Sequence, residues 1–160
     1  MPDWITHTGI AWLLCKISNR SRYFTAVVMV GSVLPDVAKM ITRPLEMLLR
    51  VGLDFRGELA LAPIHSLVGA TLLAVAVASL VAKDEKQAKL LLSGLCIGFI
   101  LHFAVDSLLF YGITPLAPLT WDSVSFGLIW HDSLLPAAMT IALMVLFKLG
   151  ERLRVGRAMR

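Results

Sequence analysis

Residues 90–111 read LLLSGLCIGFILHFAVDSLLFY, and the only His, Asp, Glu, Lys or Arg residues in this run are His102 and Asp106. At about 1.5 Å per helical residue, a run of this length crosses the ~30 Å hydrocarbon core of a bilayer. A second run, Ala60–Ala82, is equally long and contains His65 as its only residue of these kinds. Both runs predict transmembrane helices.

Three further apolar segments are shorter. Residues 133–149 fall slightly short of a full span, but Lys148 at their end can extend to the interface. Residues 23–36 predict a short span, and residues 4–15 a partial or interfacial helix. The chain is 58% hydrophobic and 16% charged, whereas soluble domains average about 45–50% and 25%, so lipid must cover much of it. We therefore predict an all-α, multi-pass membrane helical bundle of about five hydrophobic helices, formed by a single domain over residues 1–160.

The basic residues predict the orientation of the bundle. Alternating spans place three groups on one side, and these are Lys16, Arg20 and Arg22; Lys83, Lys86 and Lys89; and Lys148, Arg152, Arg154, Arg157 and Arg160. By the positive-inside tendency this side is cytoplasmic, with the N-terminus outside and a basic cytoplasmic tail at residues 150–160. The tail is interpreted as an anchor beside acidic headgroups. No aromatic platform or base-reading motif accompanies it, so the expected partner is the lipid bilayer and not nucleic acid.

The two connections expected on the outer side differ in character. The first, at about residues 39–59, predicts an amphipathic helix lying along the interface, with Pro44 in its first turn and leucines at helical spacing. The second, residues 112–132, carries the tryptophans typical of an interfacial belt. Cys15 and Cys96 lie far apart in apolar segments and are interpreted as buried small hydrophobic residues.

Six histidines and aspartates are expected at or near the outer ends of the helices, at one level. They are His7, Asp36, His65, His102, Asp106 and His131. An aspartate near the bilayer centre costs roughly 2.5–3.5 kcal/mol on insertion scales, so such residues need partners. Three or four imidazoles and two carboxylates at one level suit Zn²⁺ or a similar transition metal. We therefore predict that the first five are metal ligands, with His131 as an additional candidate.

Four of these residues also have a plainer interpretation. His102 and Asp106, at positions i and i+4, lie on one helix face about 6 Å apart, and could share a metal ion or bond only to each other. Asp36 follows a proline that can end or kink its helix, and alone it would be an ordinary helix-end carboxylate. His7 could be interfacial. His65 stands at an expected helix start, where the dipole favours the neutral, metal-binding imidazole.

In their order along the chain, these residues and their neighbours resemble a known family. The motifs are Thr6-His7, Gly31 with Leu34-Pro35-Asp36, His65-Ser66, Gly98-x-x-x-His102-x-x-x-Asp106, and Gly112-Ile113 through Pro118. Over roughly residues 6–120 this set resembles the LexA-regulated, inner-membrane metal-dependent hydrolase family. Members of that family commonly carry another histidine after the Pro-Asp and a His-Arg pair just before a Thr-His-Ser motif. This chain has neither the histidine nor the His-Arg pair. More distantly, the order His, Asp, His, His-x-x-x-Asp is similar to the zinc-dependent phospholipase C and P1-type nuclease superfamily.

The resemblance implies a prokaryotic inner membrane protein whose site faces outside and holds one or two divalent ions, with zinc as the expected metal. It implies hydrolysis of a phosphoester, such as that of a lipid headgroup, through metal-activated water. Asp36 and Asp106 would be the catalytic carboxylates, and Asp106 would bridge two ions. Lys39, Arg43 and Arg56 could hold a phosphate or bind only lipid headgroups. The alternatives are a metal or proton transporter, although no internal repeat is visible, and a non-catalytic scaffold with a structural metal.

Overall fold

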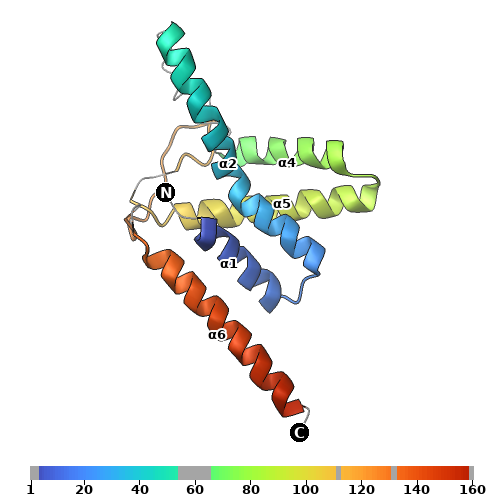
Figure 1. The fold of residues 1–160 in the computed structure, drawn as a ribbon. Helices are drawn as coiled ribbons and strands as arrows, with labels where there is room; N and C mark the ends of the chain where they lie inside the picture. The colour runs from blue at the N-terminus through green and yellow to red at the C-terminus, as the bar shows by residue number, and fades with distance from the viewer. Residues whose placement is uncertain (1–3, 54–65, 111–112, 131–132, 159–160) are drawn as a thin grey trace.

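The computed structural model describes residues 4–53, 66–110, 113–130 and 133–158 of the chain. Its regular elements within these ranges are five α-helices, namely α1 (Trp4–Ile17), α2 (Arg22–Leu53), α4 (Leu67–Val81), α5 (Glu85–Asp106) and α6 (Leu135–Ala158). Helices α2 and α5 pack against each other. Helix α1 packs against both of them, α4 packs against α5, and α6 lies along α1 (Figure 1). The all-α class with about five helices is confirmed.

Helices α4 and α5 form a hairpin whose helix starts are capped by side chains. Ser66 caps α4 by accepting a hydrogen bond from the Gly69 N–H at 3.1 Å, and Asp84 caps α5 by accepting from the Gln87 N–H at 2.7 Å. Such caps satisfy N–H groups that have no partner inside the helix. The main apolar core lies between the two helices and contains Ala70, Ala74 and Ala78 of α4 and Leu91, Leu95, Phe99 and Phe103 of α5.

Helices α2 and α5 approach each other closely because each has a glycine at the contact. A Cβ atom on Gly98 would lie 2.4 Å from the Val28 carbonyl oxygen and 2.6 Å from the Ser32 nitrogen. A Cβ atom on Gly31 would lie 2.7 Å from the Leu95 carbonyl oxygen. Small residues at such contacts let membrane helices approach with their backbones nearly touching. A main-chain group of α2 can therefore reach a side chain of α5.

The expectation that the second helix ends at Asp36 is wrong. Helix α2 continues through Pro35 and Asp36 to Leu53. A proline inside a helix removes one N–H donor and crowds one carbonyl, and the hydrogen bonds on either side can still hold the helix together. The described part of the predicted connection at about residues 39–59 is thus a continuation of α2 and not a separate helix. Its interfacial position stays a prediction.

Two other helix boundaries also differ from expectation. Residues 60–82 were expected to form one long helix, but α4 begins only at Leu67, after its Ser66 cap. Its 15 residues extend about 22 Å, less than the ~30 Å of a hydrocarbon core. At the other end of the chain, α6 reaches Ala158, so part of the basic tail lies on a helix. Beyond the apolar segment, Glu151, Arg152, Leu153 and Arg154 favour helix, and α6 continues through them.

Among the described helices, α5 is the one long and apolar enough to cross a membrane, and α4 is apolar but shorter. The outer surface is nevertheless apolar on several helices. The exposed fraction of the residue exceeds one half at Leu72, Leu80, Ile100, Leu135 and Leu146. Extensive exposed apolar surface marks a face that contacts lipid or another protein. More than one crossing of the membrane stays a prediction.

The helix directions agree with the alternation predicted from the basic residues. Helices α1 and α6 run parallel, because Gly9 packs on Thr140 and Trp12 lies farther along against Phe147. Helices α2 and α5 also run parallel, since Val27 lies at Gly94 and the Ser32 region lies farther along at Gly98. In the predicted topology each of these pairs crosses in the same direction.

We expect a thiol reagent that cannot cross the membrane to label Gly57→Cys, but not Gln87→Cys, in intact cells. The reason is that the positive-inside tendency places the connection containing Gln87 in the cytoplasm. The unmutated chain, whose Cys15 is buried and Cys96 half-buried, serves as the control for background labelling. Labelling of Gln87→Cys alone would reverse the orientation and move the outer site to the cytoplasmic side.

Candidate metal centre

Four of the predicted ligands meet where α1, α2 and α5 contact one another. They are His7 from α1, Asp36 from α2, and His102 and Asp106 from α5. The Nε2 atoms of His7 and His102 lie 3.4 Å and 3.3 Å from the two carboxylate oxygens of Asp106. Each carboxylate oxygen of Asp36 lies 3.9 Å from one of the same two Nε2 atoms. The imidazole rings stack with their centroids 4.3 Å apart. We refer to these four side chains as the His–Asp cluster.

The His–Asp cluster is almost completely buried. The exposed fractions are 0% for His102, 1% for His7, 4% for Asp106 and 5% for Asp36. Because burying an isolated ion costs several kcal/mol, two carboxylates at such a place need cations close to them. The small exposed surface of the cluster lies on the two carboxylates, since both imidazole side chains are fully buried.

The main-chain carbonyl of Ser32 determines which nitrogen of His102 carries the proton. The His102 Nδ1 atom lies 2.9 Å from this oxygen. A carbonyl oxygen can only accept a hydrogen bond, so Nδ1 must donate. In the neutral ring, Nε2 then directs its lone pair toward Asp106, which is the arrangement that binds a metal ion. The close approach of α2 and α5 at Gly31 and Gly98 makes this contact available.

A lone pair on the His102 Nε2 atom and the Asp106 oxygen 3.3 Å away repel each other unless a cation lies between them. That cation is a metal ion or a proton, which either the ring or the carboxyl group can carry. A hydrogen bond from a protonated ring to a carboxylate usually measures about 2.7–2.9 Å. Two ligand atoms that each lie about 2.0–2.1 Å from a tetrahedral zinc ion are roughly 3.3–3.4 Å apart. The spacing in the cluster is therefore compatible with a shared metal ion, and the same residues also form ion pairs with one another.

The donor atoms also fit a metal ion in kind and burial. His7, His102 and Asp106 each offer one ligand atom, all within 4.8 Å of one another, and this group could hold a metal ion. Both ring nitrogens of His7 and the Oδ2 atom of Asp36 are buried without a hydrogen-bond partner among the described residues. Buried polar atoms are normally paired, and a cation would satisfy the His7 Nε2 and Asp36 atoms together. Asp36 can act as a fourth ligand or as a nearby base.

The remaining predicted site residues are less fully placed. His65, His131 and Arg56 lie outside the described residues, so their roles stay predictions. Lys39 and Arg43 lie on α2 beyond Asp36, and their side chains are also outside the described part of the structure. The phosphate-binding role of these cations is therefore still a prediction.

Ser66 has a structural role that the His65-Ser66 motif alone did not reveal. Its hydroxyl donates a hydrogen bond to the Ala117 carbonyl at 2.7 Å, and the Leu67 N–H donates to the Pro115 carbonyl at 2.8 Å. These bonds tie the start of α4 to the connection that follows α5. Ser66 is fully buried, so both bonds are shielded from competition with water.

The sequence also did not reveal the Ser32 carbonyl as the group that orients His102. Every residue has a backbone carbonyl, so the identity of a residue does not show which carbonyl will accept a hydrogen bond. The available signal was indirect, because Gly31 directly precedes Ser32, and Gly98 lies four residues before His102. Two glycines near candidate ligands on different helices indicate a close backbone approach.

We expect a chelator to lower the unfolding temperature of the purified protein in detergent. A metal ion present at a hundredfold excess over its Kd stabilises the folded state by about 2.7 kcal/mol, or roughly 5–10 °C for a chain of this size. His102→Ala should remove both the bound metal and the chelator response. His131→Ala, the same change outside the four converging residues, should have a smaller effect. A protein that binds no added metal and melts identically with and without chelator would refute the metal centre.

Comparison with protein families identifies a family that covers nearly the whole chain. A family model described as YdjM inner membrane protein matches residues 3–158 of the chain. The matched range contains all four residues of the His–Asp cluster. Neither the curated proteins nor the solved structures gave a match. The match agrees with the inner-membrane family resemblance of the sequence motifs. Hydrolase activity and a relationship to phospholipase C or P1-type nucleases stay predictions.

Proposed function

Because the chain belongs to the YdjM inner membrane protein family, we propose that it is a membrane-bound, metal-dependent hydrolase of phosphoesters. The observation that carries this proposal is the carboxylate of Asp106 held between two imidazole Nε2 atoms, at 3.4 Å and 3.3 Å. A purely structural polar pair would need one histidine. Three helices instead deliver two imidazoles and two carboxylates to one buried point, which is the donor set of a hydrolytic metal centre.

In this proposal His7, His102 and Asp106 hold the ion, and zinc is the metal that suits their donor atoms. A bound divalent ion would polarise a phosphoryl oxygen and lower the pKa of water toward about 7. The chain itself keeps the ligands in place. The Ser32 carbonyl orients one imidazole through a 2.9 Å hydrogen bond, and the burial of both rings excludes competing water from the ligand nitrogens.

Asp36 is proposed as the general base. Its two oxygens lie 3.9 Å from the two Nε2 atoms, farther than those of Asp106. A carboxylate beside the ligands, but less tightly engaged than they are, can accept a proton from the attacking water. The small remaining exposure of the two carboxylate side chains is the side from which water and substrate would approach.

The proposed substrate is a phosphoester at the outer surface of the inner membrane, such as a lipid headgroup. This choice is supported by membership of an inner membrane family and by the basic residues Lys39 and Arg43 on the same helix as Asp36. Arginine and lysine bind phosphate through charge-assisted hydrogen bonds. The outward orientation of the site follows from the predicted topology.

The test is a hydrolysis assay on the purified protein in detergent and in bilayer discs. The protein would be loaded with Zn²⁺ or Mn²⁺ and offered soluble phosphoesters and phospholipids. We expect turnover that depends on the added ion and stops with a chelator. A metal-loaded protein that hydrolyses none of them would refute the proposal. If the same protein then carries ions or protons across sealed vesicles, the transporter interpretation replaces it.

A further inference from the structure

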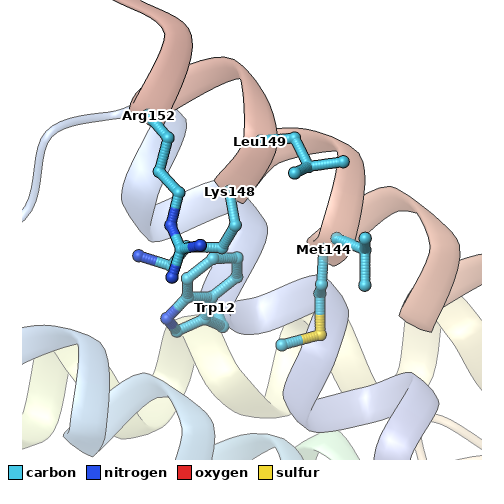
Figure 2. Close-up of a pocket in the computed structure, with 6 residues that line it drawn as sticks. Trp12, Met144, Lys148, Leu149 and Arg152 are labelled. Atoms are coloured by element: carbon cyan, nitrogen blue, oxygen red, sulfur yellow. The ribbon is translucent and has the colours of Figure 1, made fainter. Parts of the chain in front are cut away.

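A groove between α1 and α6 lies away from the His–Asp cluster. It is lined by Trp12, Met144, Val145, Lys148, Leu149 and Arg152 and has a volume of about 320 Å³ (Figure 2). His7 lies in the first turn of α1, and the helical rise of about 1.5 Å per residue places Trp12 roughly 7.5 Å farther along. Two of its lining residues, Lys148 and Arg152, lie in the half of α6 that carries the basic residues. It therefore belongs to a different part of the molecule from the metal centre.

The groove is apolar on its walls and basic at one end. Met144, Val145 and Leu149 supply hydrocarbon, while Lys148 and Arg152 supply positive charge. The Lys148 Nζ atom lies 5.3 Å from the centre of the Trp12 ring, and Figure 2 shows Lys148 and Arg152 both extending toward that ring. A ligand that fits these walls must combine a hydrocarbon part with an anionic group.

The basic end of the groove keeps a net positive charge. Lys148 forms an ion pair with Glu151 at 2.9 Å, and both side chains are about half exposed, at 54% and 44%. Exposed pairs of this kind contribute little, so Lys148 can also engage another anion. Arg152 forms no ion pair with the described residues and is exposed. The single carboxylate of Glu151 therefore does not neutralise the two cations.

We propose that this groove binds an acidic phospholipid of the cytoplasmic leaflet, with an acyl chain along Met144 and Leu149 and its phosphate between Lys148 and Arg152. Basic recesses between membrane helices on the cytoplasmic side are suited to acidic headgroups. Arginine can bind a phosphate through two parallel hydrogen bonds. Tryptophan prefers the depth where headgroups meet acyl chains, which is where Trp12 would then lie. Membership of an inner membrane family places such lipids around the helix.

The proposal is tested by titrating the full-length protein in detergent with phosphatidylglycerol and with phosphatidylcholine of the same chain length. Native mass spectrometry would count the bound lipids. We expect phosphatidylglycerol to bind about 30-fold more tightly, the factor expected for two basic residues beside an acidic headgroup. The double variant Lys148→Gln with Arg152→Gln should lose this preference. The double variant Lys83→Gln with Lys86→Gln removes the same charge from another predicted cytoplasmic connection and should retain it.

A second readout reports the position of the acyl chain. Phosphatidylglycerol with brominated chains should quench the fluorescence of the unmutated protein more than that of Trp12→Phe. Equal affinity for the two lipids, or an equal loss in both double variants, would refute a specific lipid site. Displacement of the lipid by millimolar inorganic phosphate would show a simple anion site and would also overturn the proposal.

Discussion

Asp106→Asn is expected to remove the bound metal and abolish ion-dependent phosphoester hydrolysis, while the protein still folds in the membrane. The carboxylate of Asp106 contacts His7 Nε2 at 3.4 Å and His102 Nε2 at 3.3 Å, using a different oxygen for each. Asparagine has nearly the same shape but no negative charge, and its amide nitrogen cannot act as a ligand. Removing a residue that only hydrogen-bonds to a metal ligand typically lowers metal affinity or activity by about 10–100-fold. Losing a ligand should cost at least about 100-fold.

The measurement combines initial hydrolysis rates at excess metal with the metal content of the purified protein. Asp122→Asn is the matched control, because Asp122 is exposed on the connection after α5. It should keep both activity and metal. If Asp106→Asn turned over substrate at the rate of the unmutated protein, the His–Asp cluster could not be the catalytic centre.

Gly98→Ala is expected to destabilise the whole molecule, although alanine is the better helix former by about 1 kcal/mol. The added Cβ atom would lie 2.4 Å from the Val28 carbonyl oxygen and 2.6 Å from the Ser32 nitrogen. Both are backbone atoms, so no side chain can rotate away and α2 must move. Overpacking of this kind typically costs about 1–3 kcal/mol, or roughly 2–12 °C in unfolding temperature.

The shift of α2 should also pull the Ser32 carbonyl away from His102 Nδ1, so Gly98→Ala should bind metal more weakly. Thermal unfolding in detergent and a metal titration measure the two effects. Gly150→Ala is the matched control, since no atom lies within 4 Å of a Cβ atom there, and it should be neutral or slightly stabilising. A Gly98→Ala protein that melts no lower than the unmutated chain would contradict the close helix contact.

The apolar runs by themselves predicted the helical class and the approximate number of helices. This succeeded because a backbone in an apolar environment must satisfy its own hydrogen bonds, and a helix does so within one segment. The contact between His102 and Asp106 was also predictable. Residues four apart on a helix share a face whatever the rest of the chain does.

Helix lengths were less predictable than helix existence. Pro35 was expected to end or kink its helix, and the helix does not end there, since α2 continues to Leu53. In the other direction, α4 begins only at Leu67, inside a longer apolar run. Hydropathy reports what surrounds a segment, whereas helix ends depend on local caps such as Ser66 and on whether neighbouring helices support the chain.

Only the tertiary structure decided how the four side chains of the His–Asp cluster contact one another. Sequence patterns placed His7, Asp36, His102 and Asp106 at one level of the bundle. They could not show that one carboxylate lies between two imidazoles, or that the Ser32 carbonyl holds His102. Contacts along one helix follow from its 3.6-residue period. Contacts between helices depend on which faces meet and how closely the backbones approach, and here the glycines at 31 and 98 set that distance.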